Sequence, residues 1–253
     1  MKAKRASKMQ QKLLAGLAMA LTLNFGGDAA ASLVTIGTAR YNGGDYNLIW
    51  DDDNNGQSIV WLDYAQNGMS NWQDIVNWAA GLESSLIVNL VSGYSVTWDS
   101  AWRLPNTVDG QFVESPFGNT TAGYNITSSE MGHLFYVELG NNGYQNPDGS
   151  YNPTTEPPWN LTNTGGFANL IPSWYWSGTE YASQKWWPNA YGEAAWVFIM
   201  HSGRQDIHLE DAVSYGMAVR AGQVMRAEPL PEPGTLALLA IGLTGLGYSR
   251  RKQ

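Results

Sequence analysis

Two short apolar segments, one near each end, restrict what this chain can fold into. The first spans residues 13–23 and follows a basic start, and the second spans residues 234–248 and precedes a basic end. Neither segment reaches the about 20 residues that a comfortable membrane span needs. The chain therefore divides into an N-terminal segment (1–31), one central domain (32–227) and a C-terminal segment (228–253), and the globular core has to come from the central domain.

The N-terminal segment has the three-part layout of a secretory signal peptide. Basic residues are followed by the apolar run 13–23 and then by small residues that end at Ala31. As a helix the run would rise about 16 Å, roughly half the thickness of the hydrocarbon core, which is typical of a cleaved segment. A buried amphipathic helix is the alternative, but the run is apolar on all sides. We expect cleavage by signal peptidase near Ala31 and Ser32.

The C-terminal segment has three parts in a fixed order. Pro231, Glu232 and Pro233 come first, the apolar run 234–248 follows, and the cations of Arg250, Arg251 and Lys252 close the chain. Such an order resembles a stop-transfer sequence whose cations stay on the cytoplasmic side. The apolar run has 15 residues, so it predicts one short hydrophobic helix that serves as a temporary membrane anchor. An ordinary tail anchor is the alternative.

Over residues 231–253 this order resembles the PEP-CTERM sorting signal, the tag that exosortases process in Gram-negative bacteria that make exopolysaccharide. By this resemblance Pro231, Glu232 and Pro233 are the recognition motif, and Arg250, Arg251 and Lys252 are the retention cluster. The resemblance implies a protein that is exported and held transiently in the inner membrane by residues 234–248. After processing by exosortase it would reach the cell surface or the extracellular matrix.

Charge and cysteine content exclude several classes of function for the central domain. Residues 32–227 hold six basic and 19 acidic side chains, a formal net charge of −13. A nucleic-acid surface needs clustered cations, so we expect no nucleic-acid partner. The chain has no cysteine, which excludes disulfides, thiolate metal sites and cysteine nucleophiles.

Two segments of the domain have helical patterns. Residues 70–73 form a capping box before apolar residues at helical spacing, and residues 127–130 form a second one before another apolar stripe. We expect Ile75, Val76, Leu134 and Phe135 to be buried on these two helices.

The rest of the domain predicts short antiparallel strands. Residues 46–50 and 59–63 flank Asn55-Gly56, a strong hairpin signal, and residues 195–200 and 205–209 flank Ser202-Gly203. Residues 215–220 predict a final strand, and Trp196 and Phe198 are expected in the core. Strands at both ends around two helices predict an α+β domain whose termini meet in one sheet.

Four motifs occur in the order of a known family. They are Trp102-Arg103-Leu104-Pro105, residues 174–181, residues 195–198 and Ala218-Val219-Arg220. Across residues 45–222 the chain resembles the Lcl C-terminal domain family, which is of unknown function. The resemblance implies a C-type-lectin-like fold related to the formylglycine-generating enzyme, whose cysteine chemistry this chain lacks. Read physically, Arg103 and Arg220 are suited to bind carboxylates and carbonyls that hold loops to a sheet.

No candidate for metal or nucleophilic chemistry is well formed. Residues 51–56 begin like a calcium loop, but Leu62 stands where an EF-hand needs glutamate, so a polar hairpin turn is the interpretation. His133, His201 and His208 lack ligand spacing. Ser177 and Thr179 lie outside any nucleophile motif, and we expect them to bond nearby loop backbone. We therefore predict no metal, no cofactor and no enzymatic activity.

Aromatic residues crowd residues 159–191 among amides and hydroxyls, a mixture that suits sugar binding. Trp174 and Trp176 are expected in the core, which leaves Trp159, Trp186, Trp187 and Tyr191 as candidate ligand-binding residues. Together with the lectin-like and sorting resemblances, this favours a non-catalytic module that binds polysaccharide or another matrix component. The alternatives are a structural surface protein without a small ligand and, least favoured, a hydrolase with an unidentified carboxylate pair.

Overall fold

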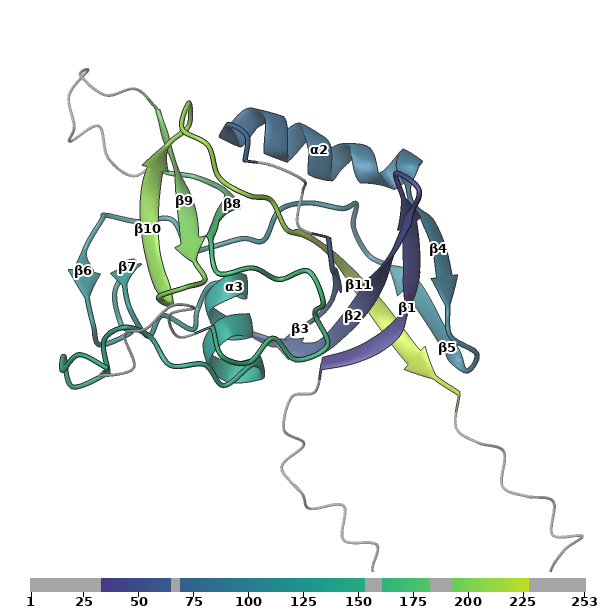
Figure 1. The fold of residues 1–253 in the computed structure, drawn as a ribbon, viewed down its shortest axis with the longest axis horizontal. Coiled ribbons are helices and arrows are strands. Elements are labelled where there is room, and N and C mark those ends of the chain that lie inside the picture. Colours follow the sequence, from purple (N-terminus) through teal and green to yellow (C-terminus); the bar gives the residue numbers. More distant parts are fainter. Residues whose placement is uncertain (1–32, 65–68, 153–160, 183–192, 228–253) are drawn as a thin grey trace, which may run out of the picture. The chain divides into compact units, whose positions relative to one another are not determined.

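A computed structural model describes residues 33–64, 69–152, 161–182 and 193–227 (Figure 1). The chain divides into two compact units, residues 1–30 and 31–253, and all described residues belong to the second unit. The elements are, in order, β1 (Leu33–Tyr41), β2 (Gly44–Asn54), β3 (Gln57–Leu62), α2 (Trp72–Ser85), β4 (Ile87–Leu90), β5 (Tyr94–Trp98), β6 (Glu114–Ser115), β7 (Ala122–Gly123), α3 (Glu130–His133), the π-helix η1 (Leu134–Glu138), β8 (Trp174–Glu180), β9 (Ala194–Ile199), β10 (Arg204–Leu209) and β11 (Ala218–Arg226).

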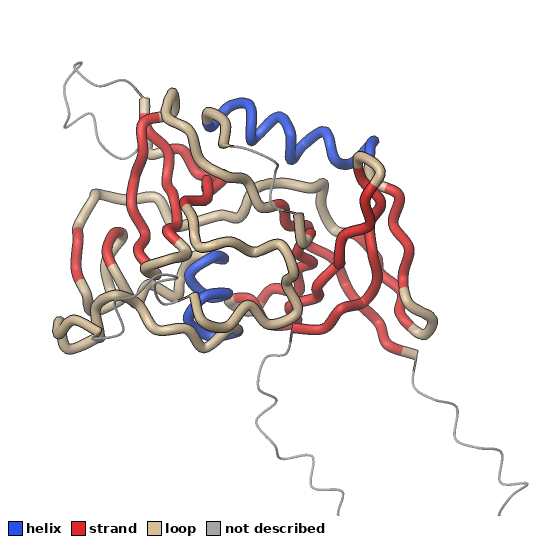
Figure 2. The backbone as a smooth tube through the Cα atoms, viewed as in Figure 1, coloured by secondary structure: helices blue, strands red, loops and turns tan. Residues whose placement is uncertain are grey.

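The described residues are mostly β-sheet, with 42% strand against 13% helix (Figure 2). The prediction of an α+β, C-type-lectin-like fold is therefore wrong. The motifs behind it are largely buried core segments, which many β-rich folds need. No helix among the described residues is long and apolar enough to cross a membrane, and the helix predicted for residues 234–248 lies outside them.

One sheet has six strands in the order β4-β1-β2-β3-β11-β5. Its first and last strands in the chain, β1 and β11, confirm that the two ends of the domain meet in one sheet. Its outer strands, β4 and β5, are joined by residues 91–93 alone. Because so short a connection keeps both edges together, the sheet curls into a nearly closed, barrel-like form.

Apolar side chains fill the inside of this curled sheet. Alternate residues of its strands point inward, as the two-residue period of a strand requires. Trp102 from a loop and Leu82 from α2 complete the packing, and the fully buried members from the strands are Ile36, Ala39, Leu48, Val60, Leu62 and Ala218.

The predicted hairpins are confirmed. Asn55 and Gly56 join β2 to β3 with φ of 53° and 80°, the left-handed values of a type I′ turn. The β9–β10 hairpin turns through Gly203, whose φ is 72°. The left-handed backbone explains why asparagine and glycine stand at these turns.

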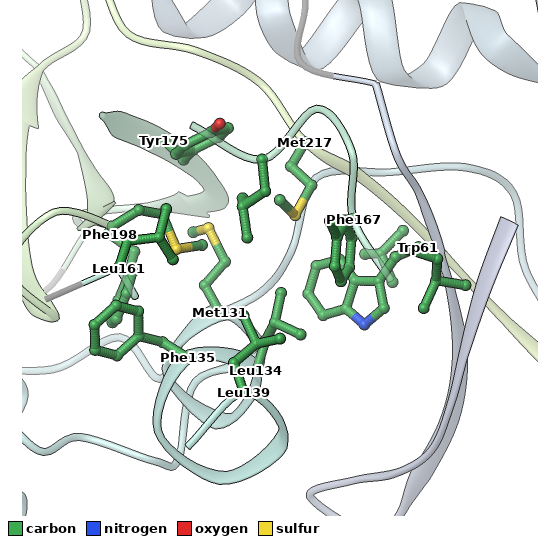
Figure 3. Close-up of a cluster of buried hydrophobic side chains, with 14 of the residues drawn as sticks. Trp61, Met131, Leu134, Phe135, Leu139, Leu161, Phe167, Tyr175, Phe198 and Met217 are labelled. Carbon is green, nitrogen blue, oxygen red and sulfur yellow. The ribbon is translucent and has the colours of Figure 1, made fainter. Parts of the chain in front are cut away.

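The other sheet has five strands in the order β6-β7-β10-β9-β8. Its strand β9 is buried on both faces, because Phe198 belongs to one apolar cluster and Val197 to another. The cluster with Phe198 also contains Trp61 of β3, Met131 and Phe135 of the α3–η1 segment, Tyr175 of β8 and Met217 (Figure 3). This cluster ties the two sheets and the α3–η1 segment into one core.

Both predicted helices form, but each differs from its prediction. Helix α2 begins after Asn71, whose side chain accepts a hydrogen bond from the Asp74 N–H at 2.9 Å, and not after Ser70. Helix α3 is capped by Ser129 and has only four residues. From Leu134 the chain continues as the π-helix η1.

The core residues predicted on the two helices and on β9 are confirmed with one exception. Ile75, Leu134, Phe135, Trp196 and Phe198 are buried, whereas Val76 is only partly buried. Helix α2 buries Ile75, Ala79 and Leu82, and Val76 lies at the edge of that stripe.

Candidate functional site

The predicted ligand-binding residues all lie outside the described residues; they are Trp159, Trp186, Trp187 and Tyr191. The sorting motif, the retention cluster and the N-terminal segment also lie outside them. The structure does show where residues 183–192 attach. The Tyr181 N–H donates to the Ala194 carbonyl at 2.8 Å, so this segment connects neighbouring strands β8 and β9.

The aromatic residues expected in the core are used for packing. Trp176 is fully buried, and its indole N–H donates to the Ser70 carbonyl at 3.0 Å. Trp174 is partly buried and packs against the His208 ring, with ring centres 5.1 Å apart. The prediction for Trp176 is thus confirmed, and Trp174 contributes partly to the same packing.

The two predicted arginine anchors are confirmed. Arg103 donates two hydrogen bonds of 2.7 Å to the carboxylate of Glu130, which also accepts the Asn106 N–H at 2.7 Å. Arg220 donates to the Ser100 carbonyl at 2.6 Å and to Glu83 at 3.0 Å. Both guanidinium groups hold loops to the curled sheet.

Ser177 and Thr179 also have the predicted structural role. The Ser177 hydroxyl donates to the Pro105 carbonyl at 2.9 Å, and the Thr179 hydroxyl bonds the backbone of Thr107. These bonds attach β8 to the loop after Arg103.

The turn at residues 51–56 is a hairpin with an inward-facing carboxylate. Asp51 is fully buried, and one of its oxygens accepts hydrogen bonds from the Trp61 indole at 3.0 Å and the Asn54 amide at 2.9 Å. Among the described residues, no group of three or more histidine or acidic side chains is placed to hold a metal ion.

A surface cluster of three tyrosines was missed in the sequence. The ring centres of Tyr124 and Tyr144 lie 6.2 Å apart, and those of Tyr144 and Tyr151 lie 5.1 Å apart. Tyr151 is 63% exposed, and the other two are partly buried. We call Tyr124, Tyr144 and Tyr151 the tyrosine cluster. Its three rings follow one another, and Tyr151 is the ring most exposed to solvent.

The local sequence explains how the tyrosine cluster is built. Residues 144–152 form a tight hairpin in which the Asn152 N–H donates to the Tyr144 carbonyl at 2.8 Å. At its tip Asp148 accepts hydrogen bonds from the Ser150 N–H and hydroxyl, and Gly149 has a φ of 83°. This turn chemistry brings Tyr151 back beside Tyr144.

Two further bonds attach this hairpin to the second sheet. The Tyr144 N–H donates to the Ser202 carbonyl at 2.8 Å, and the Asn125 amide donates to the Gln145 carbonyl at 2.9 Å. Because Asn125 follows Tyr124, the second bond fixes the distance between Tyr124 and the hairpin. The aromatic surface is therefore held by backbone as well as by ring packing.

Charged groups lie beside the tyrosine cluster. One nitrogen of Arg204 contacts the carboxylates of Glu114 and Asp206, each at 3.1 Å. Burial is the main cause that raises the pKa of Tyr124, and the Arg204 charge opposes it while Glu114 adds to it. Burial likewise raises the pKa of Asp206, against the charge of Arg204. Tyr124 of the cluster thus lies near one guanidinium and two carboxylates.

This arrangement has the chemistry of a sugar-binding surface. Rings accept the apolar C–H faces of a sugar, and neighbouring carboxylates and amides accept or donate hydrogen bonds to its hydroxyls. The usable sequence signal was the loop-rich composition of residues 141–163, which holds four of the eleven prolines. Tyr124 could not be assigned to the site because it is distant in sequence.

Evidence for export comes from the C-terminal segment and not from the fold or the tyrosine cluster. A family model described as the PEP-CTERM protein-sorting motif matches residues 229–252. The chain therefore carries a PEP-CTERM motif, which marks an exported protein that is anchored transiently in the membrane and processed by exosortase. No curated protein and no solved structure matches the chain, and the expected resemblance to the Lcl C-terminal domain family is not supported.

Proposed function

We propose that residues 32–227 are a non-catalytic binding module that engages an extracellular polysaccharide, or another matrix component, after export. The observation that carries the proposal is the tyrosine cluster, a series of three rings near the carboxylates of Glu114 and Asp206. In this scheme signal peptidase removes residues 1–31, and exosortase processes the chain near Pro231, Glu232 and Pro233. The module then acts at the cell surface or in the extracellular matrix of a Gram-negative bacterium.

The carboxylates near the cluster favour binding over hydrolysis. A glycosidase places two carboxyl groups on opposite sides of the scissile bond, whereas two carboxylates that contact one guanidinium lie on the same side of it. Glu114 and Asp206 both contact Arg204. This pairing suits two groups that accept hydrogen bonds from hydroxyls.

The test is binding of the purified chain to a glycan array, followed by affinity measurement on the polymers that bind. Tyr151→Ala should weaken binding by about tenfold, ~1.4 kcal/mol, because the most exposed ring of the cluster is lost. Tyr151→Phe keeps the ring and should keep most of the affinity.

Ile87→Ala is the matched control, because Ile87 is also exposed (62%) but lies on β4. The same array tests Trp186→Ala and Trp187→Ala, which stay predicted ligand contacts. Equal affinities for wild type and Tyr151→Ala would remove the tyrosine cluster from the proposal. If no glycan on the array binds, the result would favour the second candidate function, which is described next.

That second candidate is a structural surface protein that binds nothing small. It is favoured by the complete burial of Trp61, Trp176 and Trp196, whose large rings are used in packing. In that case the tyrosine cluster would add to the stability of the hairpin at residues 144–152. Tyr151→Ala would then lower the melting temperature without changing any binding.

A further inference from the structure

His133 and Glu138 form a buried contact that no packing role explains. The His133 Nε2 lies 3.3 Å from the Glu138 Oε1, and their side chains are 13% and 0% exposed. Neither His133 Nε2 nor the two carboxylate oxygens of Glu138 has a hydrogen-bond partner among the described residues. Buried polar groups are normally hydrogen-bonded, so such a group calls for an explanation.

The π-helix is what brings the two residues together. In an α-helix, residues three and four apart share a face, and residues five apart do not. In η1 the backbone instead bonds over five residues, as in the Leu139 N–H to Leu134 carbonyl bond of 2.9 Å. His133 and Glu138 are also five apart. A π-turn is rare and often marks a functional position.

The surroundings of Glu138 are acidic. The charged groups that face it are Asp51, Asp52 and Asp53 from β2 and His133 from α3. Asp51 is fully buried, and its Oδ1 also has no hydrogen-bond partner among the described residues. An ionised Glu138 would therefore be a buried charge beside like charges, which is unfavourable unless a proton neutralises it.

We propose that His133 and Glu138 are a buried proton-binding pair that makes the packing of the α3–η1 segment against β2 stronger in mild acid than in mild alkali. The proton lies on the Glu138 carboxyl, which contacts His133 Nε2 at 3.3 Å. On release of the proton, Glu138 faces the aspartates of β2 as an anion. The pair then weakens the contact between η1 and the β2–β3 hairpin.

The titration of Glu138 supports the sign of this effect. Burial first, and then Asp51, Asp52 and Asp53, raise the pKa of Glu138 from 4.5 to about 7. Between these two values the folded protein holds a proton that the unfolded chain releases, so the stability that this group contributes is complete below pH 4.5 and is lost as pH rises through about 7. Burial raises the pKa of Asp51, Asp63, Asp206 and Glu210 in the same direction.

The experiment compares melting temperatures of the purified full chain at pH 5 and pH 8. Wild type should lose about 2–4 °C more than Glu138→Gln over this interval, because glutamine cannot titrate. Asp45→Asn removes an exposed carboxylate of β2, the strand that carries Asp51, Asp52 and Asp53, and should keep the wild-type slope. Parallel curves for wild type and Glu138→Gln would overturn the proposal.

Two further measurements keep the proposal testable if Glu138→Gln does not fold. The side-chain carboxyl carbon of Glu138, followed by NMR in isotope-labelled wild type, should titrate between pH 5 and pH 8. A transition near pH 4 would overturn the proposal. The melting temperature at pH 8 should also be the same with chelator and with added Zn²⁺. A rise with Zn²⁺ would make the pair a metal site instead.

Discussion

At the scale of single residues, Arg103 and Glu130 show how one charged pair organises several loops. Glu130 accepts three hydrogen bonds of 2.7 Å, two from Arg103 and one from the Asn106 N–H. Its side chain is 10% exposed, so the charge is compensated inside the protein. In the sequence Arg103 and Glu130 are 27 positions apart, so no local pattern indicates that they pair.

Glu130→Gln should lower the free energy of unfolding by about 2–3 kcal/mol, because it leaves the Arg103 charge partly buried without its partner. Chemical denaturation of the full chain measures the change. Asp45→Asn breaks the exposed Arg40–Asp45 pair, where both side chains are more than 50% exposed, and should change stability by less than about 0.5 kcal/mol. Equal effects of the two substitutions would contradict this role for Glu130.

At the scale of elements, the helix boundaries were decided by local geometry that the sequence left open. Ser70 and Asn71 are both good N-cap residues, and the helix uses Asn71. The reason is that the Ser70 carbonyl is occupied elsewhere, since it accepts hydrogen bonds from the Ser214 N–H at 3.1 Å and the Trp176 indole at 3.0 Å. An N-cap residue needs a carbonyl that is free to accept the first hydrogen bond of the helix. Tertiary contacts leave that carbonyl free at Asn71, where it accepts the Ile75 N–H at 3.2 Å.

Asn71→Ala should destabilise the protein by about 1 kcal/mol, because the Asp74 N–H loses its acceptor. Ser70→Ala should have a smaller effect, since its hydroxyl bonds the exposed Asp74 carboxylate at 3.2 Å. Thermal unfolding of the two variants measures the difference. The reverse order would mean that Ser70 is the cap after all.

At the scale of the whole molecule, the sorting motif and the folded domain are separate segments of the chain. The motif at residues 229–252 follows the last described residue of the domain, Ala227. We expect its recognition to depend on the short linear pattern and the apolar run, which do not require the core of the domain. Sorting should therefore tolerate changes in the domain, and the fold should tolerate changes in the motif.

Deletion of residues 231–253 should abolish exosortase processing and delivery to the surface while leaving the domain folded. Cell fractionation and the mass of the mature protein measure processing, and circular dichroism measures the fold. Glu232→Gln in the full chain keeps the apolar run and tests the motif alone. Unchanged surface delivery and unchanged mass after the deletion would contradict the assignment.

The sequence by itself determined the features that depend on short-range order. The PEP-CTERM motif, the hairpin at Asn55-Gly56 and the positions of six of eight predicted core residues follow from local pattern, because turn geometry and burial depend on neighbouring residues. Arg103 and Arg220 were predicted as anchors from their side-chain chemistry, and their partners were found only in the structure.

Only the tertiary structure decided the fold class and the sites. The curled sheet arises because β4 and β5 pair with distant strands, β1 and β11, while a short turn joins them, a long-range constraint that no sequence window contains. In the same way, Tyr124 joins Tyr144 and Tyr151 through packing, and His133 reaches Glu138 through a π-turn that sequence patterns do not predict. Local pattern determines which elements form, whereas the burial of their faces against distant partners determines where they meet.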